Sequence, residues 1–464
     1  MKTIISNRIY VYDASMDLYW WVKDNLTLVN PVYATMMRIG KQDTIARKKI
    51  SEHVRLYVER GSDLILPSGV LYAIWPFIKN SPYEIRFSNN GDVIDKSLKI
   101  SMPLFDYQEE AVQVMLAAKG GVLQASAGSG KTMIGIEIIK RLGKNSLWIC
   151  GKIDLLNQTV DRIHKLYPSI PVGTITDGKV QMVKNGITVS TIQTLTNVDS
   201  DLYANNFDVV VVDECHSCIS TPTDMRMFGK VLEKIAARYK FGLTATPSRS
   251  DTLLPSMYAI LGVNLNGEFA PTFVIEKSKT NTLTAAHIRV DLDTAFSYQT
   301  LAEDGTFSYP DLIEYLGADE KRNQAIVDNV VKVREKHKKQ LVLCYRVDHC
   351  EIINEMLQAR GVKSVLLTGD VTKKKRKEIL NSLVDWEVIV GTVSLVKEGL
   401  DLPELSCLHW AMVIGDKVAT IQSAGRIERV MEGKPEPEIY DYVDIHYPYC
   451  IGKYKKRVSF LKKR

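Results

Sequence analysis

The sequence predicts an α/β fold, in which two successive domains, each a parallel sheet covered by helices, follow a small α+β N-terminal domain. The chain has 464 residues, enough for about three domains. Short apolar runs rich in β-branched residues alternate with longer helical patterns over 104–262, and the alternation starts again over 317–451. Residues 1–103 differ from both, because they combine many aromatic residues with a basic stretch at 38–49.

The strands of the two α/β domains are predicted from apolar runs typical of strands buried on both faces. In the first domain these runs are 120–125, 146–150, 186–191, 207–214 and 240–246. In the second they are 340–345, 363–369, 386–392 and 407–415. The intervening segment 263–316 has no strong period, so we expect a linker or accessory element there.

The formal net charge of +6 is unevenly distributed along the chain. Residues 1–103 carry +4 and residues 452–464 carry +7, which leaves −5 for the rest. We therefore expect a basic C-terminal tail, and two basic ends that attract a nucleic acid. Because 45% of the residues are hydrophobic and 25% are charged, a disordered or fibrous class is excluded.

The composition also predicts a soluble, cytosolic protein with no membrane partner. No stretch is long and apolar enough to cross a membrane. The seven cysteines lack the spacing of a disulfide framework, which favours reduced thiols. Cys215 and Cys218 form a C-x-x-C pair, but no second pair lies at the spacing that a structural zinc site needs.

The strongest local motif is ASAGSGKT at 125–132, between a predicted strand and a predicted helix. Its small residues let backbone N–H groups turn toward phosphate oxygens at a helix N-terminus. Lys131 is expected to reach the β and γ phosphates, and Thr132 to offer its hydroxyl to Mg²⁺. The motif predicts a site for ATP and Mg²⁺, whose loop residues are Ala127, Gly128, Ser129 and Gly130.

Two further motifs suit hydrolysis of that nucleotide. The run FDVVVVDECH at 207–216 ends a buried strand in two carboxylates, so Asp213 is expected to hold Mg²⁺ and Glu214 to orient and deprotonate the attacking water. In QSAGRIER at 422–429, a helix would place Arg426 and Arg429 one turn apart on one face. We expect them to stabilise charge on the transferring phosphoryl group.

In this order, over 104 to about 445, the motifs resemble those of superfamily 2 helicases, nucleic-acid motors with two RecA-like domains. The resemblance implies that Gln108 of LFDYQ contacts the adenine base and that Gln422 acts with the two arginines. In LTATP at 243–247, Thr244 and Thr246 would couple the nucleotide state to domain closure. In TVSLVKEGLDLP at 392–403, Gly399 and Asp401 would face the nucleotide.

The same resemblance implies contacts with a nucleic-acid strand. In this family the loops at 150–158, 190–195, 345–349 and 367–370 grip the sugar-phosphate backbone. The candidate residues are Lys152, Thr191, Gln193, Arg346, Thr368 and Thr392. The aromatic run Tyr19–Trp21 has two interpretations, stacking on an unpaired base or a division between core and surface.

The DECH form of the acidic motif favours DNA motors. The stretches at 24–33 and 64–71 resemble phage branch-migration helicases of the UvsW type, which implies a monomeric motor that remodels forked and four-way-junction DNA, with duplex bound by residues 1–103. Two alternatives within the enzyme class are an RNA helicase and the translocating motor subunit of a restriction complex. An alternative of another class is a DNA-binding module with a regulatory ATPase.

Overall fold

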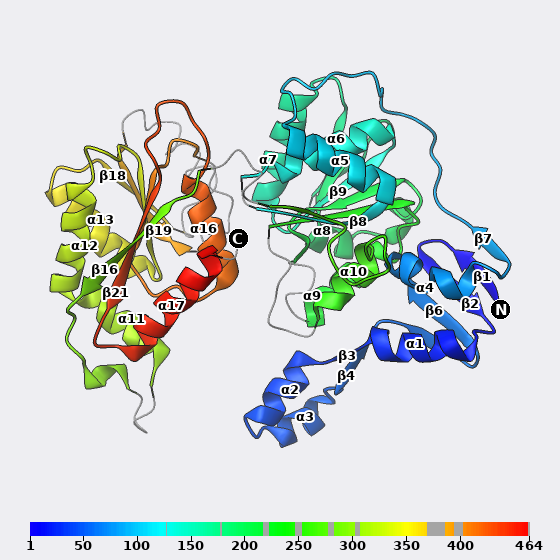
Figure 1. Ribbon diagram of the computed structural model, residues 1–464, viewed down its shortest axis with the longest axis horizontal. Helices are drawn as coiled ribbons and strands as arrows, with labels where there is room; N and C mark the ends of the chain where they lie inside the picture. The colour runs from blue at the N-terminus through cyan, green and yellow to red at the C-terminus, as the bar shows by residue number, and fades with distance from the viewer. Residues whose placement is uncertain are drawn as a thin grey trace. The chain divides into compact units, whose positions relative to one another are not determined.

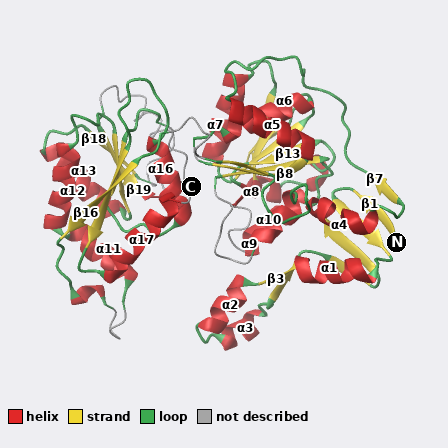
Figure 2. Ribbon diagram, in the orientation of Figure 1, coloured by secondary structure: helices red, strands yellow, loops and turns green. Residues whose placement is uncertain are grey.

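The computed structural model shows two compact units, Met1–Thr280 and Asn281–Arg464, whose sheets are covered by helices (Figures 1 and 2). The structure describes residues 1–126, 128–176, 179–216, 222–245, 253–276, 283–301, 307–368, 386–393 and 402–462. The predicted α/β class, with two parallel-sheet domains after a small N-terminal domain, is confirmed. The division between the units, after Thr280, falls within the segment 263–316 that was predicted to link the two α/β domains.

The N-terminal part of unit 1 is a five-stranded sheet of order β5-β6-β2-β1-β7. Its core lies between the sheet and the helices α1 and α4, because Leu18, Val22 and Ile74 pack with Ile9 and other buried strand residues. The bounds are β1 Lys2–Ile5, β2 Arg8–Tyr12, β5 Val58–Arg60, β6 Asp63–Pro67, β7 Tyr83–Ile85, α1 Met16–Leu26 and α4 Leu71–Ile78.

A helical arm is inserted in this N-terminal part and contains the predicted basic stretch. A two-stranded ribbon of β3 Thr27–Val29 and β4 His53–Arg55 carries the short helices α2 Pro31–Arg38 and α3 Gln42–Lys48. Neither helix has a buried residue. Figure 1 shows both helices projecting from the rest of unit 1.

The rest of unit 1 is an eight-stranded sheet of order β11-β10-β12-β9-β13-β14-β8-β15, in which only β11 runs antiparallel. Its strands are β8 Gly120–Ala125, β9 Ser146–Cys150, β10 Val172–Thr176, β11 Lys179–Gln181, β12 Ile187–Thr191, β13 Val209–Val212, β14 Tyr239–Thr244 and β15 Phe273–Ile275. Alternate residues of β13 face two different cores, which explains the unbroken apolar run in the sequence.

Helices cover both faces of this sheet. One core contains residues of α5 Asp106–Ala118, α6 Lys131–Leu142 and α7 Ile153–Leu166. The other contains residues of α8 Ile192–Asn197, α9 Pro222–Leu232 and α10 Leu254–Leu261. The sheet is therefore accessible only at its edges and at the ends of its strands.

The N-terminal part is closely packed onto this first α/β domain. Gly69 accepts a backbone hydrogen bond from Val263 (2.9 Å), and a Cβ added to Gly69 would lie only 2.5 Å from the carbonyl oxygen of Ala259 in α10. Arg8 also forms an ion pair with Glu233 at 2.6 Å. Only glycine permits the close backbone approach at position 69.

Unit 2 is a six-stranded sheet of order β16-β21-β20-β17-β19-β18, and all of its strand pairs are parallel. Helices α12 and α13 pack on one face, and α16 packs on the other. The bounds are β16 Ala286–Leu292, β17 Gln340–Cys344, β18 Ser364–Leu367, β19 Val388–Thr392, β20 Cys407–Trp410, β21 Glu438–Asp444, α11 Tyr309–Ala318, α12 Glu320–Lys332, α13 Val347–Ala359, α16 Lys417–Ile427 and α17 Pro448–Lys462.

The predicted linker or accessory element at 263–316 is instead divided between the two units. Strand β15 extends the sheet of unit 1 beside β8, and β16 extends the sheet of unit 2 beside β21. Helix α11 packs in unit 2 against residues that follow β20 and β21. The sequence pattern is weak because both strands lie at sheet edges, where fewer side chains are buried.

The described part of the expected basic tail at 452–464 is helical, because residues up to Lys462 belong to helix α17. Arg457 is only 1% exposed, and its guanidinium forms two hydrogen bonds with Asp441, at 2.6 and 2.9 Å. Arg457 also donates to the carbonyl of Ile414 at 2.6 Å. One of the seven positive charges therefore neutralises a buried carboxylate in the fold.

None of the helices within the described ranges is long and apolar enough to span a bilayer. The six cysteines described are buried free thiols, and no group of three or more metal-ligating side chains occurs in the same part of the chain. Cys218 lies outside the described residues.

We expect unit 2 to lose stability in mild acid, because two of its histidines are buried. Burial lowers the pKa of His349 and of His409 to about 3. In the unfolded chain each of these histidines takes up a proton below the ordinary histidine pKa of about 6.5, whereas in the folded chain it stays neutral down to about pH 3. The free energy of unfolding should therefore fall as the pH drops from 6.5 toward 3, by about 1.4 kcal/mol per pH unit for each histidine.

Urea unfolding of the full chain at pH 7, 6 and 5 measures this slope. In the fold, His409 lies 2.9 Å from the hydroxyl of Tyr442 and 2.8 Å from Oε1 of Gln340. His409→Gln removes the titrating group, so it should reduce the slope even if it lowers the stability at pH 7. An unchanged slope in this variant would contradict the assignment.

Candidate functional site

The functional motifs of unit 1 meet at one edge of its sheet. Strands β8, β9, β12, β13 and β14 are parallel, so their carboxyl ends lie at the same edge. The candidate residues that end or follow these strands are the loop 126–130, Lys152, Thr191, Asp213 and Thr244. This edge is where open α/β sheets bind ligands.

The loop between β8 and α6 has the backbone of a phosphate cradle. Gly128 and Gly130 have φ values of +85° and +82°, in the left-handed region that favours glycine. A Cβ at position 130 would lie 2.3 Å from Nε2 of Gln108. The Lys131 amine donates to the carbonyls of Ala125 and Ser126, at 3.2 and 3.4 Å. This amine lies where it can exchange carbonyl partners for phosphate oxygens.

Gln108 is bonded to this loop. It is only 2% exposed. Its Nε2 donates to the Ser129 carbonyl at 2.9 Å, and its Oε1 accepts from the Phe105 N–H at 3.0 Å. The Tyr107 hydroxyl, which the motif analysis did not single out, donates to the same carbonyl of Ser129 at 3.3 Å. These bonds stabilise the loop conformation, and the contact of Gln108 with an adenine base stays a prediction.

The two carboxylates after β13 occupy different environments. Asp213 is 7% exposed, and burial together with the nearby charge of Glu214 raises its pKa, while the positive charge of Lys131 lowers it. Glu214 has a φ of +47°, unusual for a residue with a side chain, and its N–H donates to Asp213 Oδ1 at 2.9 Å. Such strained backbone is common at catalytic sites.

This donor set fits a hard cation bound together with a phosphate. Mg²⁺ prefers oxygen ligands and usually takes one or two carboxylates, with phosphates and waters completing its shell. Asp213 supplies a carboxylate beside the loop lysine, and Thr132 supplies a hydroxyl in the first turn of α6. Glu214 is more accessible than Asp213, with 26% of its side chain exposed.

His216 connects the acidic motif to the end of β14, a role that the sequence analysis missed. Its Nδ1 lies 3.0 Å from the hydroxyl of Thr244 and 3.3 Å from Oε2 of Glu214. The side chain of Thr244 is fully buried. In the sequence, the only sign of this link is the histidine of the DECH motif, His216, which follows Asp213 by three residues.

Thr244→Val should separate hydrolysis from motor work. Valine keeps the shape of threonine but cannot bond to His216, so the link between the acidic motif and β14 is lost. We expect unwinding to fall about tenfold while ATP turnover changes about threefold or less. Parallel assays of phosphate release and strand separation measure both quantities, with Thr196→Val on α8 as the matched control. Equal losses in both assays would contradict a coupling role.

The strand-contact candidates differ in accessibility. Lys152 and Gln193 are exposed, whereas Thr191 is 6% exposed and caps α8 by accepting from the Thr194 N–H at 3.3 Å. In unit 2, Arg346 precedes α13 with its side chain 45% exposed and pairs with Asp348 at 2.9 Å. The remaining two, Thr368 and Thr392, are 4% and 7% exposed.

The arginine motif of unit 2 differs from the predicted geometry. Helix α16 ends at Ile427, so Arg426 lies in its last turn and Arg429 lies beyond it. The expectation that both arginines share one helical face was wrong. Glu428 is the residue that follows the helix, and its buried side chain accepts from the Ala285 N–H at 3.0 Å. Gln422 is partly exposed, and its Oε1 has no hydrogen-bond partner among the described residues.

Four predicted site residues lie outside the described residues: Ala127, Thr246, Gly399 and Asp401. The aromatic run on α1 divides between surface and interior. Trp20 is 57% exposed, whereas the ring of Trp21 stacks on Phe269 with centroids 6.4 Å apart, and the Tyr19 hydroxyl donates to Glu59 at 2.6 Å. Of the three rings, Trp20 is therefore the most accessible for stacking.

Two known families match the chain. The family described as "Type III restriction enzyme, res subunit" matches residues 101–249, and the "Helicase conserved C-terminal domain" matches residues 321–431. Together they span more than half of the chain and cover the motifs of both units. They define the chain as a helicase, an enzyme that hydrolyses ATP. The motifs that these two models cover are the ones in which the sequence resembles superfamily 2 helicases.

Several relatives carry helicase names. "Probable helicase D10" of Escherichia phage T5 is 27% identical over 69% of this chain and 67% of its own length. "DNA 3'-5' translocase XPB2" of Sulfurisphaera tokodaii is 26% identical over 72% of this chain and 80% of its own length. "Putative ATP-dependent RNA helicase L396" of Acanthamoeba polyphaga mimivirus is 25% identical over 89% of this chain and 77% of its own length.

The fold is also found in a solved structure, that of S. cerevisiae Dbp5 L327V bound to RNA and ADP BeF3. It matches 85% of this chain and 92% of its own chain with a TM-score of 0.54 at 13% sequence identity. This likeness supports the RecA-like architecture of the two units.

Proposed function

We propose that this helicase uses ATP and Mg²⁺ to translocate on DNA and to unwind or branch-migrate forks and four-way junctions in recombination, replication-fork processing or repair. The observation that carries the proposal is the meeting of a phosphate loop, two carboxylates and Thr244 at one sheet edge. The relative named as a DNA translocase favours DNA, whereas the relative named as a putative RNA helicase keeps the RNA alternative open.

In this proposal each group at the sheet edge has one task. The loop N–H groups and Lys131 bind the phosphates, and Asp213 with Thr132 holds the cation, which when bound draws negative charge from the phosphates. Glu214 orients the attacking water and accepts its proton. Gln422, Arg426 and Arg429 stabilise the charge that develops on the phosphoryl group.

The proposed DNA contacts begin with the exposed side chains Lys152, Gln193 and Arg346. Their charge and amide groups suit phosphate oxygens. For the buried Thr191, Thr368 and Thr392 we propose a supporting role at the same loops. The basic helical arm of the N-terminal part adds a positively charged surface for duplex DNA.

The test compares substrates at equal concentration. We expect ATP turnover to rise most with forked DNA and four-way junctions, less with linear duplex or single strands, and least with RNA. Labelled junction substrates then report whether arms are exchanged. Stimulation by RNA above DNA would favour the RNA-helicase alternative, and turnover on duplex without unwinding would favour the translocating motor of a restriction complex. Turnover that no nucleic acid stimulates would favour the regulatory-ATPase alternative.

A further inference from the structure

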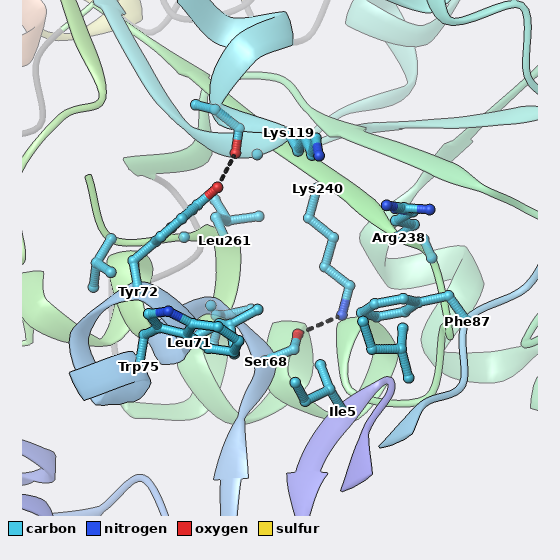
Figure 3. Close-up of a pocket in the computed structure, with 18 of the residues that line it drawn as sticks. Ile5, Ser68, Leu71, Tyr72, Trp75, Phe87, Lys119, Arg238, Lys240 and Leu261 are labelled. Carbon is cyan, nitrogen blue, oxygen red and sulfur yellow. Dashed lines mark hydrogen bonds between the residues drawn. The ribbon is translucent and has the colours of Figure 1, made fainter. Parts of the chain in front are cut away.

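A cavity of about 390 Å³ lies in unit 1 between the N-terminal part and the first α/β domain (Figure 3). Its volume is within the range of small-molecule sites. Gly120 at the start of β8 lines the cavity, whereas the phosphate loop follows the end of the same strand. A strand of this length separates the two places by roughly 17–20 Å. The cavity is therefore not part of the ATP site.

Four aromatic residues line the cavity. Tyr72, Trp75, Tyr83 and Phe87 of the N-terminal part line it, and Figure 3 shows Tyr72 and Trp75 on one side of the opening, with Phe87 across from them. The Tyr72 hydroxyl donates to the Ala118 carbonyl at 3.2 Å, and Trp75 packs edge-on against Tyr83 with centroids 5.4 Å apart. Held in this way, the rings present flat apolar surfaces to a ligand.

The charged residues of the lining all carry the same sign. Lys119, Arg238 and Lys240 line the cavity, and no aspartate or glutamate does. None of the three forms an ion pair with a carboxylate that the structure describes. Glu233, whose charge acts on Lys240, makes its ion pair with Arg8 instead. The cavity wall itself is thus cationic and carries no carboxylate.

Lys240 is the unusual member of this set, because it is only 7% exposed. Its amine donates to Ser68 Oγ at 3.1 Å and to the Leu232 carbonyl at 3.0 Å. An ammonium group has three donors, so one remains for a ligand. Burial lowers the pKa of Lys240 to about 8. A buried cation is costly when it is not paired, and a bound anion would relieve that cost.

We propose that this cavity binds an aromatic anion of mononucleotide size, with its base against the rings of Tyr72 and Trp75 and its phosphate near Lys240 and Arg238. The rings of Tyr72 and Trp75, together with Lys240 and Arg238 across from them (Figure 3), match the two chemical parts of a nucleotide. A free nucleotide and the 5′-phosphate end of a DNA strand share this chemistry. The proposal does not depend on the proposed function at the other end of the sheet.

The test uses the full chain carrying Lys131→Ala, which weakens nucleotide binding at the phosphate loop. Thymidine 5′-monophosphate, followed by titration calorimetry, should bind once per chain and about tenfold more tightly than uncharged thymidine. Adding Lys240→Met, which keeps the length of the stem but removes the charge, should weaken binding about tenfold. Lys234→Met, at an exposed lysine six residues earlier in the chain, is the matched control and should change nothing.

Absence of binding, equal binding of thymidine, or no effect of Lys240→Met would overturn the proposal. If Lys240→Met fails to fold, Arg238→Ala keeps the test valid, because the Arg238 side chain lies at the exposed rim of the cavity. Its removal should weaken binding of thymidine 5′-monophosphate about threefold.

Tetrathymidylate with and without a 5′-phosphate distinguishes the two sources of the ligand, a free nucleotide and the end of a DNA strand. Tighter binding of the phosphorylated strand than of the mononucleotide indicates a strand end, and the reverse order indicates a free nucleotide. Helicase assays remain separate, so failure here leaves the proposed function untouched.

Discussion

Replacing Lys131 with alanine should lower ATP turnover by at least about 100-fold while DNA binding changes little. The Lys131 amine bonds to the carbonyls of Ala125 and Ser126 at the mouth of the loop. Without it, the negative charge that develops during hydrolysis loses one of its cationic partners. Phosphate release measures ATP turnover, and fluorescence anisotropy of a labelled fork measures DNA binding.

Lys165→Ala is the control for this experiment. Lys165 is an exposed lysine in the last turn of α7, at the end of that helix away from the nucleotide loop. It should leave turnover within about twofold of the original protein. Retained turnover in Lys131→Ala would show that the loop at 126–130 is not the hydrolysis site. An equal loss of DNA binding would show that the variant is damaged more widely.

Replacing Arg457 with methionine should lower the free energy of unfolding of unit 2 by about 3–5 kcal/mol, because it leaves the carboxylate of Asp441 buried without its main partner. Asp441 is fully buried, and of its charged partners only His287, at 2.8 Å, would remain among the described residues. Urea unfolding monitored by tryptophan fluorescence gives the difference. A loss below about 1 kcal/mol would contradict the importance of this ion pair.

Two further variants make the measurement specific. Lys456→Met changes the adjacent, exposed residue of α17 and should be nearly neutral. The double variant Arg457→Met with Asp441→Leu removes both charges and should recover much of the lost stability. Because α17 is part of the fold, deletion of its end would test stability rather than charge. Lys455→Gln with Lys456→Gln is the appropriate test of DNA contact by this helix.

The sequence predicted the parts of the molecule that repeat a strong local pattern. The runs 120–125 and 146–150 coincide with β8 and β9, since strands buried on both faces must be apolar throughout. The phosphate loop and the acidic motif follow such strands, so topology alone brings them to one edge. The relative positions of these two motifs could therefore be predicted without knowledge of tertiary packing.

Other features depend on contacts between distant residues and leave weaker signals in the sequence. The sequence pattern does not reveal that Glu428 turns inward to the Ala285 N–H, so the end of α16 before Arg429 was missed. Likewise, the charge of Arg457 gives no sign of its partner Asp441, 16 residues earlier in the chain. A charged residue is normally exposed, and only the fold identifies an exception.

The close packing at Gly69 has a mechanical consequence. The N-terminal part shares buried apolar residues with the first α/β domain, since Ala259 of α10 belongs to the N-terminal core and Leu28 of the ribbon belongs to the core of the α/β domain. The N-terminal part and the first α/β domain are therefore expected to move together as one body, without a hinge between them. If the helical arm binds duplex DNA as proposed, the bound duplex is displaced together with the phosphate loop whenever unit 1 moves.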